Sequence, residues 1–372
     1  MTTTGYYTVG DQIFFSKSLA LIEATKTNIH PTWHFREDVF SHLDWTKGYA
    51  ENITEVYHRR ARYLREKYDY LVLSFSGGSD STVTLRSFLD QGLTVDEVLV
   101  RWPRKATQPL YTPNGFDTRP ENLLSEWDLA IEPALRRLRK EYPKIKITVI
   151  DWSDDVNSEL KEDDWFSIND HLNPGVFRKY YGLAGTPTET KMIDAGKKTA
   201  TIWGLDKPQL AYKDGEIYFY FLDKLANTVF VNNTASRTAE LFFWSPDCPY
   251  VVQAQARALY EYFIMHPEKL YLIDWDKRTT ANKSEYNALV RSLIYPLWDQ
   301  SIFQVGKPTS MAFNEYDSWM FTNLTDHRYY QSWEHGLQNI KAAIDPKYHQ
   351  YGKNGRFDGW VGFISPFYKL SS

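Results

Sequence analysis

The segment 70-YLVLSFSGGSDSTVTLRSFLDQG-92 joins an apolar run to a glycine turn and then to an amphipathic stretch. Residues 70–75 are apolar on both parities and stop at a glycine pair, which predicts a short strand buried on both faces. From Asp80 onward apolar residues recur at helical spacing, and Gly92 suits the position just past a helix C-terminus. The segment therefore predicts a strand, a tight turn and a helix, in that order.

This order of elements is typical of an anion-binding site. Gly77 and Gly78 let the backbone approach a ligand, and the first amides of a helix point outward with the positive end of the helix dipole behind them. Neither of the two common phosphate motifs, G-x-x-x-x-G-K-[ST] and G-x-G-x-x-G, is present. The turn also carries the hydroxyl groups of Ser76, Ser79, Ser81 and Thr82. We therefore expect it to hold a phosphate group.

Strands and helices are predicted to alternate around this segment. The expected strands are 70–75, 95–102, 145–152 and 199–203, and the expected helices are 50–68, 80–91 and 123–142, in which Pro133 must kink the helix or start a second one. Alternation of this kind predicts a Rossmann-like α/β fold, a parallel sheet with helices on both faces. Ligands of such sheets bind beyond the carboxyl ends of the strands. The basic side chains of 50–68 (Arg59, Arg60, Arg62, Arg65 and Lys67) are interpreted as a solvated helix face.

The chain of 372 residues is long enough for two domains. We expect an N-terminal extension over 1–49, a nucleotide-binding domain over 50–210 and an aromatic-rich, mainly helical C-terminal lobe over 211–372. Within that lobe, Asp214-Gly215 predicts a hairpin turn. Helices are expected over 250–265 and 284–297.

Composition narrows the class of protein. A net charge of −4 disfavours a chain whose main task is to coat nucleic acid, although it leaves room for a local basic patch. The single cysteine, Cys248, excludes an internal disulfide and a metal site built from several thiolates of this chain. No apolar run is long enough to span a bilayer, and the N-terminus lacks the features of a signal peptide. We expect a soluble, cytoplasmic protein without membrane partners.

The hexapeptide 76-SGGSDS-81 resembles the PP-loop, S-G-G-x-D-S, of the ATP pyrophosphatase superfamily, the adenine nucleotide alpha hydrolase-like proteins. Two further segments, 200-ATIWGLDKPQL-210 and 240-ELFFWSPDCPYVV-252, are similar to the phosphoadenosine-phosphosulfate (PAPS) reductase branch of that superfamily. This branch includes bacteriophage proteins named reductases on similarity alone. If the chain is encoded by a phage, it would act in the host cytoplasm.

The resemblance implies a HUP-type sheet and an enzyme that uses ATP and Mg²⁺. Such an enzyme cleaves ATP between the α- and β-phosphates and adenylates an acceptor oxygen, releasing pyrophosphate and then AMP. Asp80 would help to position Mg²⁺, and a second nucleophile would displace AMP from the unidentified acceptor. The nucleotide-binding residues implied are Ser74, Ser76, Gly77, Gly78, Ser79, Asp80, Ser81, Thr82 and Gly204, and the catalytic residues are Asp80, Ser81 and Lys207.

Two alternatives stay open. Reduction of a sulfonucleotide needs a cysteine thiolate, and the C-terminus 365-SPFYKLSS-372 has none, so Cys248 would have to serve. The motif also has Ser79 where those reductases often have lysine. The other alternative is a protein that binds a nucleotide, or assembles with a partner, without catalysis.

Weaker candidates follow other predicted strands. The carboxylates of Asp151, Asp154 and Asp155 are either ligands for Mg²⁺ or an amine, or part of a solvated loop. Lys207, near Asp206, either neutralises a phosphate or forms a surface salt bridge. The loop 103–120, with Arg104, Lys105 and Arg119, is interpreted as a substrate-binding lid or as a packing loop.

Overall fold

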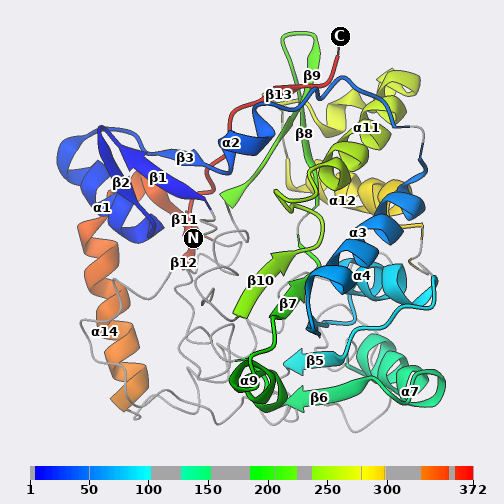
Figure 1. Ribbon diagram of the computed structural model, residues 1–372. Coiled ribbons are helices and arrows are strands. Elements are labelled where there is room, and N and C mark those ends of the chain that lie inside the picture. Colours follow the sequence, from blue (N-terminus) through cyan, green and yellow to red (C-terminus); the bar gives the residue numbers. More distant parts are fainter. Residues whose placement is uncertain are drawn as a thin grey trace, which may run out of the picture.

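A parallel five-stranded sheet, in the order β10-β7-β4-β5-β6, forms the centre of the computed structural model. The structure describes residues 5–49, 51–101, 127–151, 185–205, 207–223, 237–277, 279–296, 298, 328–351 and 357–371. The strands are β4 (Tyr70–Ser74), β5 (Glu97–Arg101), β6 (Lys146–Ile150), β7 (Thr199–Trp203) and β10 (Arg237–Leu241). All four strand pairs are parallel, so the carboxyl ends of the strands share one edge. This confirms the predicted α/β fold (Figure 1).

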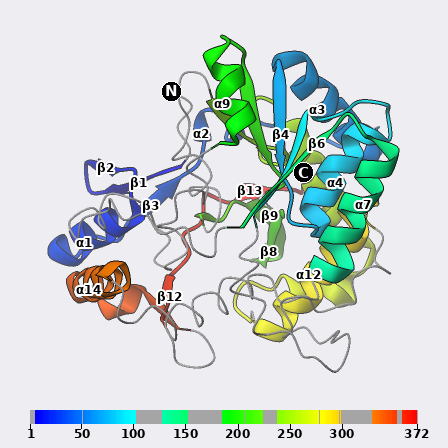
Figure 2. The same cartoon turned by 90° about the horizontal axis from the view of Figure 1, so that it is seen from below.

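Helices cover both faces of the sheet. Alternate residues of β4 point to opposite faces, and both sets are buried. Leu71 and Leu73 join the main core, whereas Tyr70 and Val72 belong to a smaller cluster on the other face. The first face carries α3 (Ile53–Lys67), α4 (Ser79–Leu89) and α7 (Glu132–Glu141), and the second carries α9 (Pro187–Asp194). Figure 2 shows α9 on one side of β4 and α4 with α7 on the other.

The helix starts follow local capping chemistry. The Asn52 side chain accepts a hydrogen bond from the amide of Glu55 at the start of α3. Before α7, a single π-helical turn (η2, Trp127–Ile131) ends where Pro133 enters the first turn of α7, so the predicted second helix does begin at this proline. No helix in the described part of the chain is long and apolar enough to cross a membrane.

Apart from β10, the described residues after 205 form helices and small antiparallel sheets. Strands β8 (Gln209–Lys213) and β9 (Glu216–Tyr220) make the predicted hairpin, with Asp214 and Gly215 at φ angles of 52° and 83°. Strand β13 (Tyr368–Lys369) pairs with β9. Helix α11 (Tyr250–Met265) packs on α3, and the 3₁₀ helix η6 (Pro267–Leu272) leads to α12 (Thr280–Ile294). Since β10 lies at 237–241, the parallel sheet extends past residue 210.

The two terminal segments lie together beside this body (Figure 1). A three-stranded sheet in the order β2-β1-β3 packs with α1, and α1 contacts α14 near the C-terminus. These elements are β1 (Tyr6–Val9), β2 (Gln12–Phe14), α1 (Lys17–Thr27), β3 (Thr32–His34), α2 (Glu37–Phe40), α14 (Arg328–Ala343), η7 (Pro346–Tyr348), β11 (His349–Tyr351) and β12 (Phe357–Trp360). The buried Asp223 carboxylate accepts hydrogen bonds from Tyr7 and the amide of Phe363 and pairs with Lys17 at 2.7 Å, which ties both termini to the chain after β9.

Candidate functional site

The turn between β4 and α4 can be built only with glycine at its centre. Gly77 has a φ of +70°, and a Cβ there would lie 2.8 Å from Cγ1 of Ile131 in η2. Gly78 is the N-cap of α4 and offers no side chain to the first turn. The amides of the residues that begin α4 therefore have no acceptor within the helix and lie at the carboxyl edge of the sheet.

The hydroxyl of Ser81 holds the shape of this turn. It accepts a hydrogen bond from the amide of Ser76 at 3.2 Å, lies 3.3 Å from the Ser76 hydroxyl and is 3.3 Å from the carbonyl oxygen of Gly78. Ser81 and Ser79 are both buried, whereas Ser76 is exposed and Thr82 is half-buried. Ser74 ends β4 just before the turn. Ser81 thus organises the loop, and the exposed Ser76 also accepts a hydrogen bond from the amide of Gly78 at 3.4 Å.

An ion pair joins α4 to the segment after β7. Nζ of Lys207 lies 2.6 Å from Oδ2 of Asp80, and the two side chains are 13% and 25% exposed. The other carboxylate oxygen, Oδ1, is buried and has no hydrogen-bond partner among the described residues. The aromatic ring of Tyr295 lies 5.9 Å from the Lys207 ammonium. The sequence-predicted residues Asp80 and Lys207 are therefore brought together.

Gly204 makes that pairing sterically possible. A Cβ at this position would lie 2.8 Å from the carbonyl carbon and oxygen of Asp80 and 2.9 Å from the hydroxyl of Thr84. The end of β7 thus lies directly against the first turn of α4. A side chain at residue 204 would push these two elements apart.

These groups fit a nucleotide phosphate accompanied by Mg²⁺. The outward amides and the helix dipole suit the phosphate oxygens. Oδ1 of Asp80 has no hydrogen-bond partner among the residues that the structure describes, and a carboxylate oxygen is a ligand that Mg²⁺ prefers. If a phosphate were bound at this turn, the Lys207 ammonium would supply the positive charge that a Walker lysine provides in phosphate loops.

The other candidates predicted at strand ends are Asp151, Asp154, Asp155, Asp206 and the loop 103–120. Asp151 directly follows β6 and is exposed. Asp154, Asp155, Asp206 and the whole of 103–120 lie outside the described residues.

Sequence reasoning missed one pair at the same edge. Arg101 and Trp203 end the two strands on either side of β4, and the Arg101 guanidinium lies 5.6 Å from the Trp203 ring. Each residue lies at or next to the end of a predicted strand. The order of the strands in the sheet was the additional information needed to predict that the two side chains meet.

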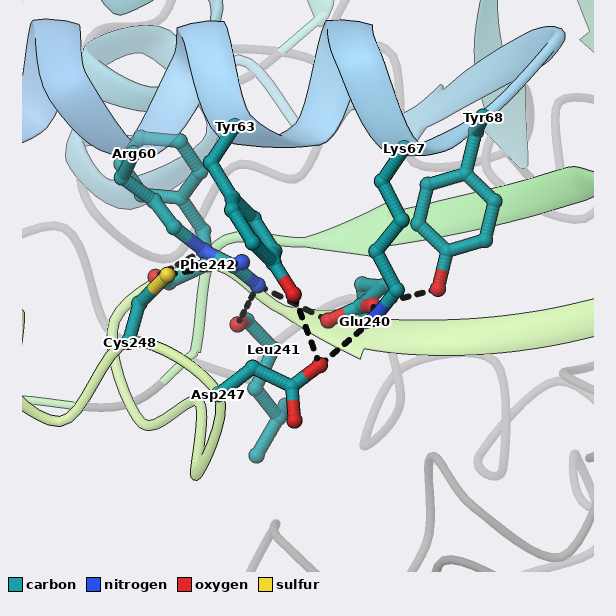
Figure 3. A network of polar contacts seen from close by, with 9 residues as sticks. All are labelled: Arg60, Tyr63, Lys67, Tyr68, Glu240, Leu241, Phe242, Asp247 and Cys248. Atoms are coloured by element: carbon teal, nitrogen blue, oxygen red, sulfur yellow. Dashed lines mark hydrogen bonds and ion pairs between the residues drawn. The ribbon is translucent and has the colours of Figure 1, made fainter.

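Cys248 lies in a buried polar network between α3 and the loop that joins β10 to α11 (Figure 3). Its thiol is 2% exposed and lies 3.5 Å from Nη1 of Arg60. Arg60 also donates to Glu240 at 2.8 Å and to the carbonyl oxygens of Leu241 and Phe242. Arg60 is fully buried, so the prediction that it lies on a solvated helix face is wrong. Its hydrogen-bond acceptors compensate for the burial of its charge.

The same network keeps its carboxylates ionised. Burial by itself would raise the pKa of Glu240, but the charges of Arg60 and Lys67 outweigh it and hold that pKa below its ordinary value. The pKa of Asp247 is likewise lowered, because the hydrogen bond and charge of Lys67 outweigh burial. Lys67 bridges the two carboxylates at 3.0 and 2.5 Å. The network therefore fastens α3 to the β10–α11 loop.

Comparison with known proteins identifies no relative: no protein-family model matches the chain, and no curated protein matches it.

A methyl group at residue 204 tests the close approach of β7 to α4. We expect Gly204→Ala to lower the free energy of unfolding by about 1–3 kcal/mol, because the new Cβ overlaps the Asp80 backbone. Gly48→Ala is the matched control, since no atom lies within 4 Å of its added Cβ. Urea unfolding measures both, and equal stabilities of the two variants would contradict the steric argument.

The ionised state of Glu240 predicts a dependence of stability on pH. Because its folded pKa is depressed, its stabilisation is complete above the ordinary glutamate pKa of about 4.3 and is lost as pH falls through the folded value. Glu240→Gln should therefore be less stable than the wild type by about 3 kcal/mol at pH 7, and the gap should narrow below about pH 4. Urea unfolding at several pH values measures the gap. Exposed Glu66→Gln serves as the control, and a gap independent of pH would refute the assignment.

Proposed function

We propose that this chain is an ATP- and Mg²⁺-dependent enzyme that cleaves ATP between the α- and β-phosphates. The AMP moiety is transferred to an acceptor oxygen, pyrophosphate is released, and AMP leaves when a second nucleophile attacks. The observation that carries this proposal is the Asp80–Lys207 pair at the N-terminus of α4, in which one buried carboxylate oxygen has no hydrogen-bond partner among the described residues. It agrees with the resemblance of 76-SGGSDS-81 to the PP-loop.

Each residue has a role that follows from its position. The first amides of α4 and the Ser76 hydroxyl bind the β- and γ-phosphates, and Ser81 keeps the turn in the shape that presents them. Oδ1 of Asp80 would hold Mg²⁺, which when bound would offset the charge of the leaving pyrophosphate. Lys207, held by Oδ2 of the same carboxylate, lies close enough to the turn to neutralise a phosphate oxygen.

Adenylation needs no nucleophilic side chain, because the acceptor oxygen itself attacks the α-phosphorus. The surroundings of Cys248 support this choice over sulfonucleotide reduction. Its thiol is buried and faces the side chain of Arg60 in a network that fastens α3 to the β10–α11 loop. Reduction would require this thiol to reach a substrate sulfur. The proposed enzyme acts in the cytoplasm, that of the host cell if a phage encodes it.

Nucleotide binding by defined variants tests the proposal. We expect α,β-methylene-ATP to bind the wild type in the presence of Mg²⁺, and Asp80→Asn and Lys207→Met each to weaken binding at least tenfold, about 1.4 kcal/mol. Isothermal titration calorimetry measures the affinities. Asp194→Asn, an exposed change on α9, is the control and should bind as the wild type does. Unchanged affinity in Asp80→Asn would refute the proposed site.

Product analysis separates the alternatives. Incubation with α-labelled ATP and candidate acceptors should release labelled AMP together with pyrophosphate. Tight binding without either product would indicate a non-catalytic nucleotide-binding protein. Thioredoxin-dependent release of sulfite from PAPS, abolished in Cys248→Ser, would indicate a reductase instead.

A further inference from the structure

Helix α7 and the turn after it concentrate positive charge. Residues 132–146 carry a net charge of +4, in a chain whose total is −4. The charged residues of this segment are the cations Arg136, Arg137, Arg139, Lys140, Lys144 and Lys146 and the anions Glu132 and Glu141. The segment therefore differs in sign from the protein as a whole.

The cations of α7 share its outward side. The side chains of Arg136, Arg137 and Arg139 are 71%, 64% and 50% exposed, whereas Leu135 and Leu138 are buried in the core. At about 100° per residue, the three arginines and Lys140 span an outward arc of roughly 160°. Figures 1 and 2 show α7 at the periphery, beside the edge strand β6.

Carboxylates within the segment neutralise only part of this charge. Glu132 is shared between Arg136 and Arg139, at 3.6 and 3.5 Å. Glu141 binds Arg137 at 2.8 Å. Within the described residues, neither Lys140 nor Lys144 has an ion-pair partner. They are both exposed. Lys146, at the start of β6, instead lies 3.8 Å from the buried Glu97 carboxylate and donates to the Thr188 hydroxyl of α9, so it belongs to the other face of the sheet.

The basic residues of α3 provide an internal comparison. Arg60, Arg65 and Lys67 each have a carboxylate within 3.0 Å, so these three cations of α3 form ion pairs within the fold. The partners of α3 come from β10 and from the chain before β5, far away in sequence. On α7 the two carboxylates come from the helix itself and form ion pairs with three arginines. The charge of α7 therefore faces solvent.

We propose that this α7 surface, formed by Arg136, Arg137, Arg139, Lys140 and Lys144, binds the phosphodiester backbone of a nucleic acid. Arginine forks match phosphate oxygens, and a row of cations matches a row of phosphates. An anionic membrane is a poorer match, since interfacial helices place large apolar side chains beside their cations. Besides its four cations, the outward arc of α7 includes only Glu132 and Pro133, and so no large apolar side chain. The inference does not depend on the nucleotide chemistry proposed above.

Fluorescence anisotropy tests this surface without ATP. The probes are fluorescein-labelled 20-nucleotide duplex DNA, single-stranded DNA and single-stranded RNA. All three carry the phosphodiester backbone, and comparing their affinities shows which kind of nucleic acid the surface prefers. We expect at least one probe to bind, and about three phosphate contacts to make binding roughly 40-fold weaker between 50 and 200 mM NaCl. The variant R136Q/R139Q/K140Q should bind at least tenfold more weakly at 50 mM NaCl, with a smaller salt dependence.

A matched variant separates local charge from total charge. K191Q/K197Q/K198Q removes the same charge from exposed lysines in and after α9 and should bind as the wild type does. Circular dichroism and thermal melting check that both variants fold. The inference is overturned if no probe binds at 50 mM NaCl, or if both variants lose affinity equally. It is also overturned if the chain binds phosphatidylserine vesicles but no nucleic acid.

Discussion

The contact between Gly204 and the backbone of Asp80 is the constraint on which the candidate site depends. Strand order places β7 beside β4, so the loops after both strands reach the same edge of the sheet. Because residue 204 has no Cβ, the end of β7 can lie against the first turn of α4. Lys207, three residues later, then reaches the Asp80 carboxylate from 127 positions away in sequence. The pair uses one carboxylate oxygen, and the other has no hydrogen-bond partner in the described part of the chain.

Elements with a strong local pattern could be predicted from sequence. The predicted bounds of β7 and α11 agree with the structure at both ends, and those of β4 and α3 differ by a few residues. In each case a run of apolar residues at one period is bounded by a glycine, a proline or a capping side chain. The turn at 76–81 was predictable for the same reason, since its positive φ at Gly77 is a backbone conformation that favours glycine.

Strand β10 shows why the rest could not be predicted. Its sequence, RTAEL, carries a charge near each end and has no alternation that predicts a buried strand. The strand is stable in the sheet because Glu240 is paired with Arg60 and Lys67, and Arg237 lies 3.2 Å from the buried Glu189. These partners come from distant helices. These ion pairs compensate for the burial of charged groups and join residues that are distant in sequence, so local sequence patterns cannot reveal them.

The two places that suit phosphate in this protein would bind it by different physical means. At α4, fixed amide dipoles and a lysine already paired with Asp80 would act at short range in a half-buried turn, where dissolved ions screen little. On α7, exposed cations would act over longer range and would release condensed counterions from a polyanion. The two places adjoin, because Ile131, just before α7, packs against Gly77. A low total charge is compatible with both, since neither place depends on the field of the whole chain.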